Sequence, residues 1–298
     1  MNEFELIETI LSGLGEATQG ADVIVGPGDD CSAIRIPTGE LLVSSIDSLL
    51  VDIHFPASAP AQLVGYRALM VALSDLAAMG AMPVQVLVSL TLDTADPVWV
   101  TALAQGMAAA AHAAGVPIVG GNIARGSVAI HVSVHGSVPQ QSLLLRSGAQ
   151  PGDQIFVTGS LGGAAAALQR GQLSGDGIEM DVLNSAYFRP EARLAEGQKL
   201  RGIAASALDV SDGLLQDLTH LIEASAVGAR IDSTLIPVTE GASLEQALSG
   251  GDDYELLFTS HQSLPELAVP VTAIGEIVAE QGLWLDGQPV AASGYQHF

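Results

Sequence analysis

One stretch in the first third of the chain, residues 61–80, reads AQLVGYRALMVALSDLAAMG. Its apolar residues continue almost without interruption until Gly80 and then Pro83, which predicts a helix over Ala61–Met79. Because this helix is apolar nearly all round, we expect it to be buried. Asp75 lies in the middle of it. An unpaired buried carboxylate is costly, so Asp75 needs either an arginine or a metal ion as its partner.

More carboxylates precede this helix, and few basic residues accompany them. Asp30 ends the segment GPGDD and Asp47 ends the segment SSID. Between Arg35 and Arg125, the only formal positive charge is Arg67. Carboxylate oxygens are hard ligands that suit Mg²⁺, so the pattern predicts a metal-dependent site. The alternatives are a buried ion pair for Asp75 and ordinary β-turns for the Gly–Asp pairs.

The composition limits the classes of function. The chain has 298 residues, with 10 basic against 33 acidic side chains and a net charge of −23. This balance argues against nucleic acid and against an anionic membrane as partners, although an acidic surface also simply aids solubility. The single cysteine, Cys31, excludes an internal disulfide and a cysteine-based zinc site. No signal peptide or spanning segment is visible, so we expect a cytoplasmic protein.

The pattern of apolar residues predicts two α/β domains, that is, an α+β fold. The turn-rich segment Gly148–Asp153 marks the change between them, and we assign residues 1–140 and 141–298 to the two domains. The expected elements of the first domain are helices over Phe4–Leu14, Ala61–Met79 and Val98–Ala114, and strands over Val23–Val25, Ser32–Ile36, Leu41–Ser44, Val84–Leu92, Ile118–Val119 and Val128–Val138. Those of the second are strands over Ile155–Val157, Tyr254–Phe258 and Val271–Ile274, and helices over Glu191–Leu200 and Leu214–Ala224.

Glycines adjoin polar residues at two further places. Gly120-Gly121-Asn122 follows a short strand, where backbone N–H groups could face a phosphate or simply form a strand-ending turn. The chain has no Walker-type lysine motif, because its only lysine is Lys199 in a different context. Ser211 and Asp212 precede a predicted helix, and the simplest interpretation is that one of them is the N-cap of this helix.

Taken together, these segments resemble the thiamine-monophosphate kinase family, which belongs to the ATP-binding superfamily that includes aminoimidazole ribonucleotide synthetase. The matching segments, in chain order, are Gly28–Cys31, Ser45–Asp47, His54–Phe55, Leu73–Ala81, Gly120–Asn122, Arg146–Ala149, Pro151–Asp153, Val157–Gly159, Asp209–Leu214, Gly250–Leu256 and Gly294–Phe298.

The resemblance implies ATP-dependent phosphorylation of thiamine monophosphate to thiamine diphosphate, with ATP as co-substrate and several Mg²⁺ ions. It also implies two domains of the aminoimidazole ribonucleotide synthetase type, in a homodimer whose N-terminal sheets form a barrel across the dimer.

The resemblance also assigns residues to roles. The implied metal ligands are Asp30, Ser45, Ile46 (through its backbone), Asp47, Asp75, Asn122, Asp209 and Asp212. The implied ATP contacts are Gly121, Asn122, Arg146 and Ser211, and the implied thiamine monophosphate contacts are His54, Asp252 and Tyr295.

The chain departs from the family pattern at three positions. Asn122 replaces the usual aspartate of a Gly-Gly-Asp-Thr-Thr-Arg segment, and an amide oxygen can ligate a metal but brings no charge. Ile46 stands where threonine is usual, and Ala72 stands where asparagine is usual.

The expected chemistry agrees with this resemblance. Phosphoryl transfer needs charge neutralisation and positioning more than covalent help, and the acceptor phosphate is already anionic at neutral pH. We therefore expect Asp30, Asp47, Asp75, Asp209 and Asp212 to act through metals and not as bases. Two alternatives stay open: another ATP-using enzyme of the same superfamily, similar to aminoimidazole ribonucleotide synthetase, or a non-catalytic protein that binds metal and nucleotide.

Overall fold

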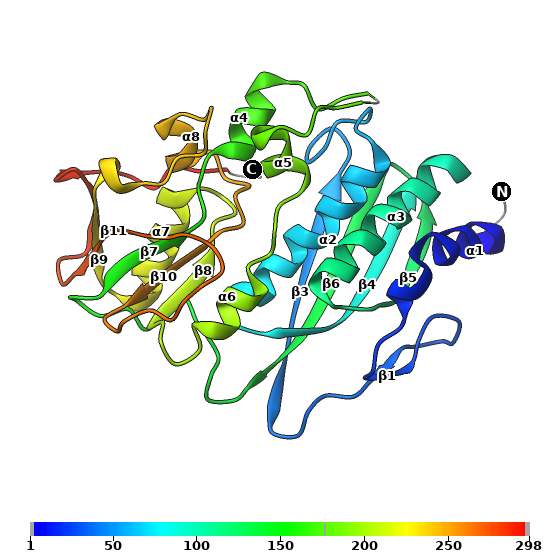
Figure 1. Cartoon of the computed structure of the whole chain (residues 1–298), viewed down its shortest axis with the longest axis horizontal. Helices are drawn as coiled ribbons and strands as arrows, with labels where there is room; N and C mark the ends of the chain where they lie inside the picture. Colours follow the sequence, from blue (N-terminus) through cyan, green and yellow to red (C-terminus); the bar gives the residue numbers. More distant parts are fainter. Residues whose placement is uncertain (1–2, 176, 296–298) are drawn as a thin grey trace. The chain divides into compact units, whose positions relative to one another are not determined.

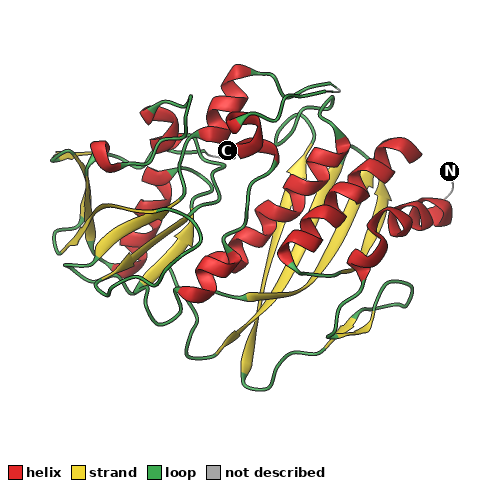
Figure 2. Cartoon of the chain, in the orientation of Figure 1, coloured by secondary structure: helices red, strands yellow, loops and turns green. Residues whose placement is uncertain are grey.

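The computed structural model describes residues 3–175 and 177–295, and the chain divides into two compact units. Unit 1 comprises the described residues of the ranges 1–76, 82–140 and 173–178. Unit 2 comprises those of the ranges 77–81, 141–172 and 179–298. Each unit has its own sheet and its own helices (Figures 1 and 2).

Unit 1 is built on a four-stranded sheet with the order β3-β6-β4-β5, in which only β4 and β5 run parallel. Helices α2 and α3 cover one face of this sheet (Figure 1). The elements are α1 (Glu3–Leu14), η1 (Gly15–Thr18), β1 (Val23–Val25), β2 (Ala33–Ile34), β3 (Glu40–Leu50), α2 (Ala61–Ala78), β4 (Met82–Leu92), α3 (Pro97–Ala114), β5 (Ile118–Arg125) and β6 (Ala129–Pro139).

Alternation along β6 separates the two faces of this sheet. Val132 and Val134 are fully buried on the face that the helices cover. The residues that alternate with them, His131, Ser133 and His135, lie on the other face and are half-buried. One face thus packs into the core of unit 1, and the other carries polar side chains along β6 and has no covering helix among the described residues.

Helices α2 and α3 approach each other closely because each has a glycine at the contact. A Cβ atom on Gly65 would lie 2.2 Å from the carbonyl oxygen of Leu103, and one on Gly106 would lie 1.9 Å from that of Gln62. The small residues therefore let the two backbones touch. The capping of α3 is regular, with Asp96 accepting from the N–H of Val98 at 2.9 Å.

Unit 2 contains a seven-stranded sheet with the order β13-β12-β9-β11-β7-β10-β8, in which β12 and β9 pair in parallel. Helix α7 packs its apolar stripe, which includes Leu214, Leu218, Leu221 and Ile222, into the core of this unit. The elements are β7 (Gln154–Thr158), α4 (Gly163–Arg170), α5 (Val182–Phe188), α6 (Leu194–Lys199), β8 (Ser206–Asp209), α7 (Leu214–Ser225), β9 (Gly228–Ile231), η2 (Ser233–Leu235), α8 (Leu244–Ser249), β10 (Leu256–Ser260), β11 (Val271–Val278), β12 (Gly282–Leu285) and β13 (Gln288–Pro289).

One sequence prediction was wrong in a way that affects the site. We expected a strand over Ile118–Val119 followed by a turn at Gly120–Asn122, but β5 continues to Arg125. A Cβ atom on Gly121 would lie 1.9 Å from the carbonyl oxygen of Val88, so this glycine serves the close approach of β4 and β5. It belongs to a strand and not to a phosphate-binding turn.

The described residues 3–175 and 177–295 contain no helix that is both long and apolar enough to cross a membrane.

Candidate functional site

The carboxylate of Asp75 does have neighbours of the predicted kind in unit 1. Ser45 and Asp47 are two residues apart on β3, so their side chains share the face that meets α2. The hydroxyl of Ser45 donates a hydrogen bond to Oδ2 of Asp75 on α2. The structure thus brings three of the predicted metal ligands together.

The charges of this trio, Ser45, Asp47 and Asp75, favour a cation. Burial raises the pKa of Asp47 to about 6, and the negative charge of Asp75 adds to the shift. Within the described residues neither carboxylate forms an ion pair with a basic side chain. Two repelling carboxylates and a hydroxyl form an all-oxygen donor set, which fits Mg²⁺.

The trio does not form a complete protein cage. Within residues 3–175 and 177–295, no three His, Cys, Asp or Glu side chains gather as metal ligands would. Mg²⁺ commonly binds to one or two carboxylates and completes its shell with water and substrate phosphates, so a pair of carboxylates is sufficient for this ion.

Two other predicted ligands of unit 1 lie on the opposite face of the sheet. Pairing runs from Asp47 through Val132 and Val88 to Gly121, which places Asn122, one residue further, on the other face. There the amide of Asn122 lies 3.5 Å from the hydroxyl of Ser89.

The side chain of Ile46 also points away from the trio, and it is 66% exposed. Only its backbone could share a metal ion with Ser45 and Asp47, as the resemblance implies. Asn122 is not brought to the trio within the chain.

Asp30 lies in the loop between β1 and β2, and His54 lies in the turn after β3. Asp30 is exposed, and its own N–H donates to the Asp29 carboxylate at 2.8 Å. The Nδ1 atom of His54 accepts from the N–H of Leu50 at 3.0 Å, which closes the turn after β3. Among the described residues, Asp30 forms no hydrogen bond or ion pair with the trio. His54 therefore has a structural role, because its ring accepts a backbone hydrogen bond in this turn.

In unit 2 the predicted residues do gather around one loop. Asp209 ends β8, and Ser211 and Asp212 follow it before α7. The carbonyl of Ser211 accepts from the N–H of Asp252 at 2.7 Å, and the carbonyl of Asp212 accepts from the N–H of Tyr295 at 2.9 Å. Residues implied in metal, ATP and substrate contacts are therefore held together by the backbone. The rest of the closing segment, residues 296–298, lies outside the described residues.

The loop that carries Asp252 has an unusual backbone. Asp252 and Tyr254 both adopt positive φ angles, of 66° and 55°, beside Gly251 at 67°. Such conformations cost about 1–2 kcal/mol for a residue with a side chain, so the surrounding contacts must hold them. The hydroxyl of Tyr254 donates to Oδ1 of Asp252 at 2.7 Å, which fixes the direction of that carboxylate.

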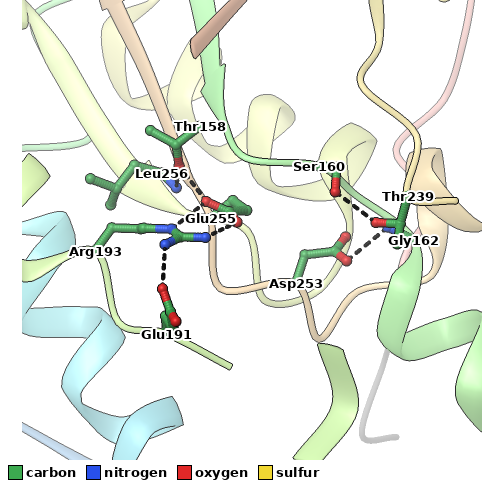
Figure 3. Close-up of polar contacts among 9 residues, drawn as sticks. All are labelled: Thr158, Ser160, Gly162, Glu191, Arg193, Thr239, Asp253, Glu255 and Leu256. Carbon is green, nitrogen blue, oxygen red and sulfur yellow. Dashed lines mark hydrogen bonds and ion pairs between the residues drawn. The ribbon is translucent and has the colours of Figure 1, made fainter. Parts of the chain in front are cut away.

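A buried ionic network anchors the same loop (Figure 3). The guanidinium of Arg193 donates to both oxygens of Glu255, at 2.7 and 2.5 Å, and Thr158 donates to Glu255 at 2.6 Å. On the other side of the loop, Oδ1 of Asp253 accepts from the N–H of Gly162 at 2.7 Å. These contacts fasten the diacid segment to β7 and to the start of α4.

Arg146, an implied ATP contact, is exposed in the loop after β6. Its carbonyl accepts from the hydroxyl of Ser225 at 3.3 Å, so the backbone is tied to the end of α7 while the guanidinium reaches solvent.

Both halves of the chain match models of one protein family. The model of AIR synthase related protein, N-terminal domain, matches residues 28–138, and that of its C-terminal domain matches residues 150–285. The thiamine-monophosphate kinase of Escherichia coli (strain K12) is 41% identical in an alignment 302 positions long, and the match covers 93% of this chain and 93% of the relative.

The chain belongs to the thiamine-monophosphate kinase family.

Two solved structures of this kinase family share its fold. The crystal structure of thiamine-monophosphate kinase from Stenotrophomonas maltophilia K279a has a TM-score of 0.88 and 35% identity, and the match covers 97% of this chain and 98% of that one. AaThiL complexed with AMPPCP and TMP has a TM-score of 0.82 and 30% identity, and the match covers 99% and 97%. The aminoimidazole ribonucleotide synthetase-like, two-domain α+β fold expected from the sequence is thereby confirmed.

The sequence analysis missed Asp217, a residue that holds the loop before α7 in this kinase-family chain. Asp217 in the first turn of α7 is buried, and its Oδ2 atom accepts from the N–H groups of Ser211, Asp212 and Gly213 at 3.0, 3.1 and 3.1 Å. Burial and the charge of Asp212 raise the pKa of Asp217 to about 6, against the opposing effect of these N–H donors. The signal in the sequence is an acid one turn after the Ser211-Asp212-Gly213 segment; Ser211 and Asp212 were assigned roles, but Asp217 was not.

Proposed function

We propose that this chain phosphorylates thiamine monophosphate with ATP and forms thiamine diphosphate and ADP. The observation that carries the proposal is the similarity over the full length to thiamine-monophosphate kinases, including one complexed with AMPPCP and TMP. Since ATP is plentiful in the cytoplasm, we propose that the reaction takes place there.

The trio of unit 1 supports a role for Mg²⁺ in this reaction. We propose that Asp47 and Asp75 hold the ion, with the hydroxyl of Ser45 and the backbone of Ile46 beside them. Bound Mg²⁺ would neutralise the charge of the ATP phosphates and of the group in transfer. Asp30 and Asn122 are proposed as further ligands of unit 1 on the resemblance alone.

In unit 2 the backbone of the loop 210–213 is held by hydrogen bonds. The N–H of Ser211 bonds to Asp217 and its carbonyl accepts from Asp252. We propose that Ser211 contacts ATP through its hydroxyl, and that the carboxylates of Asp209 and Asp212 serve as metal ligands. Arg146, with its exposed guanidinium, is proposed to bind ATP phosphates. Gly121 and Asn122 are proposed as ATP contacts on the resemblance alone, from the strand β5 and not from a turn.

The acceptor substrate requires orientation more than activation. A phosphate oxygen is already a competent nucleophile at neutral pH, so no side chain has to remove a proton. We propose that His54, Asp252 and Tyr295 bind thiamine monophosphate. The hydrogen bond from Tyr254 and the ionic network at Glu255 would keep the carboxylate of Asp252 in one direction toward the cationic thiamine.

The uncovered face of the unit 1 sheet supports a homodimer. Leu42 and Met82 both pair with Ser137 on this face, and they are 54% and 52% exposed; Ile46 lies on the same face. A strand face of this kind is stabilised when a second sheet covers it. We propose that two copies pack these faces together, so that their sheets close the barrel. A monomeric mass by light scattering at micromolar concentration would contradict this.

We also propose the division of labour between residues 1–140 and 141–298, with metal and ATP binding and dimerisation in the first and contributions to the ATP and substrate sites in the second. Point variants of residues on each side of the division would test this assignment better than a series of deletions.

An assay of ADP release tests the proposed function directly. The protein, ATP and Mg²⁺ are incubated with thiamine monophosphate or, separately, with the substrate of aminoimidazole ribonucleotide synthetase. We expect ADP release only with thiamine monophosphate, together with thiamine diphosphate on chromatography. Release with the second substrate alone would assign the chain to the alternative chemistry, and tight ATP binding without release would make it a non-catalytic relative.

A further inference from the structure

Asp217 holds the backbone of the loop before α7 through hydrogen bonds. Its side chain comes from the first turn of the helix and is almost fully buried, with 4% of the residue exposed. One carboxylate oxygen, Oδ2, accepts hydrogen bonds from three consecutive N–H groups of the loop, those of Ser211, Asp212 and Gly213. Three N–H groups that converge in this way form a nest for an anion, and here the anion is part of the chain itself.

The carbonyls on the other side of this loop are also used. Asp252 donates its N–H to the carbonyl of Ser211, and Tyr295 donates its N–H to the carbonyl of Asp212, at 2.7 and 2.9 Å. The backbone of the loop is thus held from two sides. Among the described residues, Asp217 is the one side chain that accepts hydrogen bonds from three N–H groups of this loop.

Gly213 makes this arrangement possible. It precedes α7 with a φ of 124°, and no side chain caps the helix at this position. A Cβ atom here would lie 3.0 Å from the backbone of Ser249. The usual N-cap side chain is therefore excluded by the contact, and the carboxylate of Asp217 satisfies these N–H groups in its place.

We propose that Asp217 is a positioning residue for Ser211 and Asp212, and that through them it sets the affinity for ATP and its metal ion. The proposal rests on the proposed function of this loop. Asp217 touches neither substrate nor metal in this account; it holds the shape of the loop from which the Ser211 hydroxyl and the Asp212 carboxylate project.

The test uses binding of AMPPCP with Mg²⁺ by calorimetry, and steady-state kinetics on the same preparations. Two variants are compared with the unchanged chain: Asp217→Asn, which keeps an oxygen acceptor and the side-chain shape, and Asp217→Ala, which removes the acceptor. In Asp217→Asn we expect the dissociation constant of AMPPCP and the KM for ATP to rise about three- to tenfold, because one positioning contact is weakened. In Asp217→Ala both quantities should rise further, because the acceptor is lost.

Asp153→Asn is the matched control. Asp153 is also a buried aspartate of unit 2 that accepts from a backbone N–H, that of Gln150 at 2.8 Å, but it lies in the turn before β7. We expect this variant to lower the melting temperature and leave the affinity for AMPPCP unchanged. If Asp217→Asn behaved in the same way, Asp217 would be a purely structural residue and the proposal would be wrong.

The two readouts separate this proposal from the proposed function. If the unchanged chain bound AMPPCP but formed no thiamine diphosphate, the kinase assignment would fail while the binding comparison still tested Asp217. If Asp217→Ala did not fold, the Asp217→Asn comparison would decide the outcome.

Discussion

The hydroxyl of Ser45 on β3 donates a hydrogen bond to the carboxylate of Asp75 on α2, and this contact ties the sheet of unit 1 to the one acid in a mostly apolar helix. Asp47 lies two residues further along the same strand, and its pKa is raised by burial and by the charge of Asp75. The helix tolerates Asp75 because this residue is only half-buried and its carboxylate accepts from the hydroxyl of Ser45.

Replacement of Asp75 by asparagine should abolish turnover without unfolding the protein. The amide keeps the shape and can still accept from Ser45, but it removes the charge that would hold Mg²⁺. We expect kcat to fall by about 100-fold or more, since preorganised charges supply effects of that size, while the melting temperature stays the same or rises as repulsion with Asp47 is lost. Asp93→Asn, at an exposed acid of unit 1, is the control for the change in charge. Full activity of Asp75→Asn would rule out its metal role.

Replacement of Tyr295 by alanine should weaken the use of thiamine monophosphate. The residue is 46% exposed, and its backbone N–H donates to the carbonyl of Asp212, so the backbone is held while much of the residue is accessible. Stacking on a thiamine ring is worth about 0.5 to 1.5 kcal/mol, so KM should rise roughly three- to tenfold with unchanged affinity for ATP. Tyr295→Phe retains the ring and should retain most of the affinity. Loss of thermal stability with unchanged KM would instead show that the ring only seals the core.

Replacement of Arg193 by methionine should destabilise unit 2 strongly. The side chains of Arg193 and Glu255 are 14% and 8% exposed, so the variant leaves a buried carboxylate without its cation. We expect the free energy of unfolding to fall by about 3 kcal/mol or more in urea denaturation. In Glu280→Gln, which breaks the exposed pair of Arg230 and Glu280, the change should stay below about 1 kcal/mol. Similar losses in both variants would show that burial of the Arg193 pair adds nothing.

The carboxyl of Asp253 should make stability depend on pH. Burial raises its pKa well above the usual 3.8, and the N–H of Gly162 opposes this shift only in part. Its Oδ2 atom is buried and has no hydrogen-bond partner among the described residues. Because the folded chain holds this proton more tightly than the unfolded chain, Asp253 lowers the free energy of unfolding as pH rises above about 4.

Asp253→Asn removes this titration and keeps an oxygen for the N–H of Gly162. The variant should match the unchanged chain in stability near pH 4 and exceed it near pH 8, as measured by urea denaturation at both values. An equal difference at the two pH values would show that Asp253 does not titrate in this range.

The sequence was sufficient to predict the elements that have strong local patterns. The strand Val23–Val25 was located to the residue, and the buried helix around Asp75 was placed within one residue of its end, because a long apolar run with a glycine stop has few other solutions. The domain type also followed from the segments that resemble the kinase family.

Contacts between distant segments could not be predicted in this way. Gly121 has the sequence context of a turn, and only the approach of β4 shows that it belongs to a strand. Asn122 was grouped with Asp47 by resemblance, whereas the register of the sheet places the two residues on opposite faces. The role of Asp217 depends on three N–H groups that become convergent only when the loop before α7 has folded.

The most direct test of the account is phosphorus NMR of the protein with ATP, thiamine monophosphate and Mg²⁺ in one tube. A phosphoryl transfer leaves the γ-phosphate on the acceptor, so we expect thiamine diphosphate and ADP to appear in equal amounts, with no inorganic phosphate, and only when Mg²⁺ is present. Release of inorganic phosphate without thiamine diphosphate, or no consumption of ATP at all, would contradict the assignment.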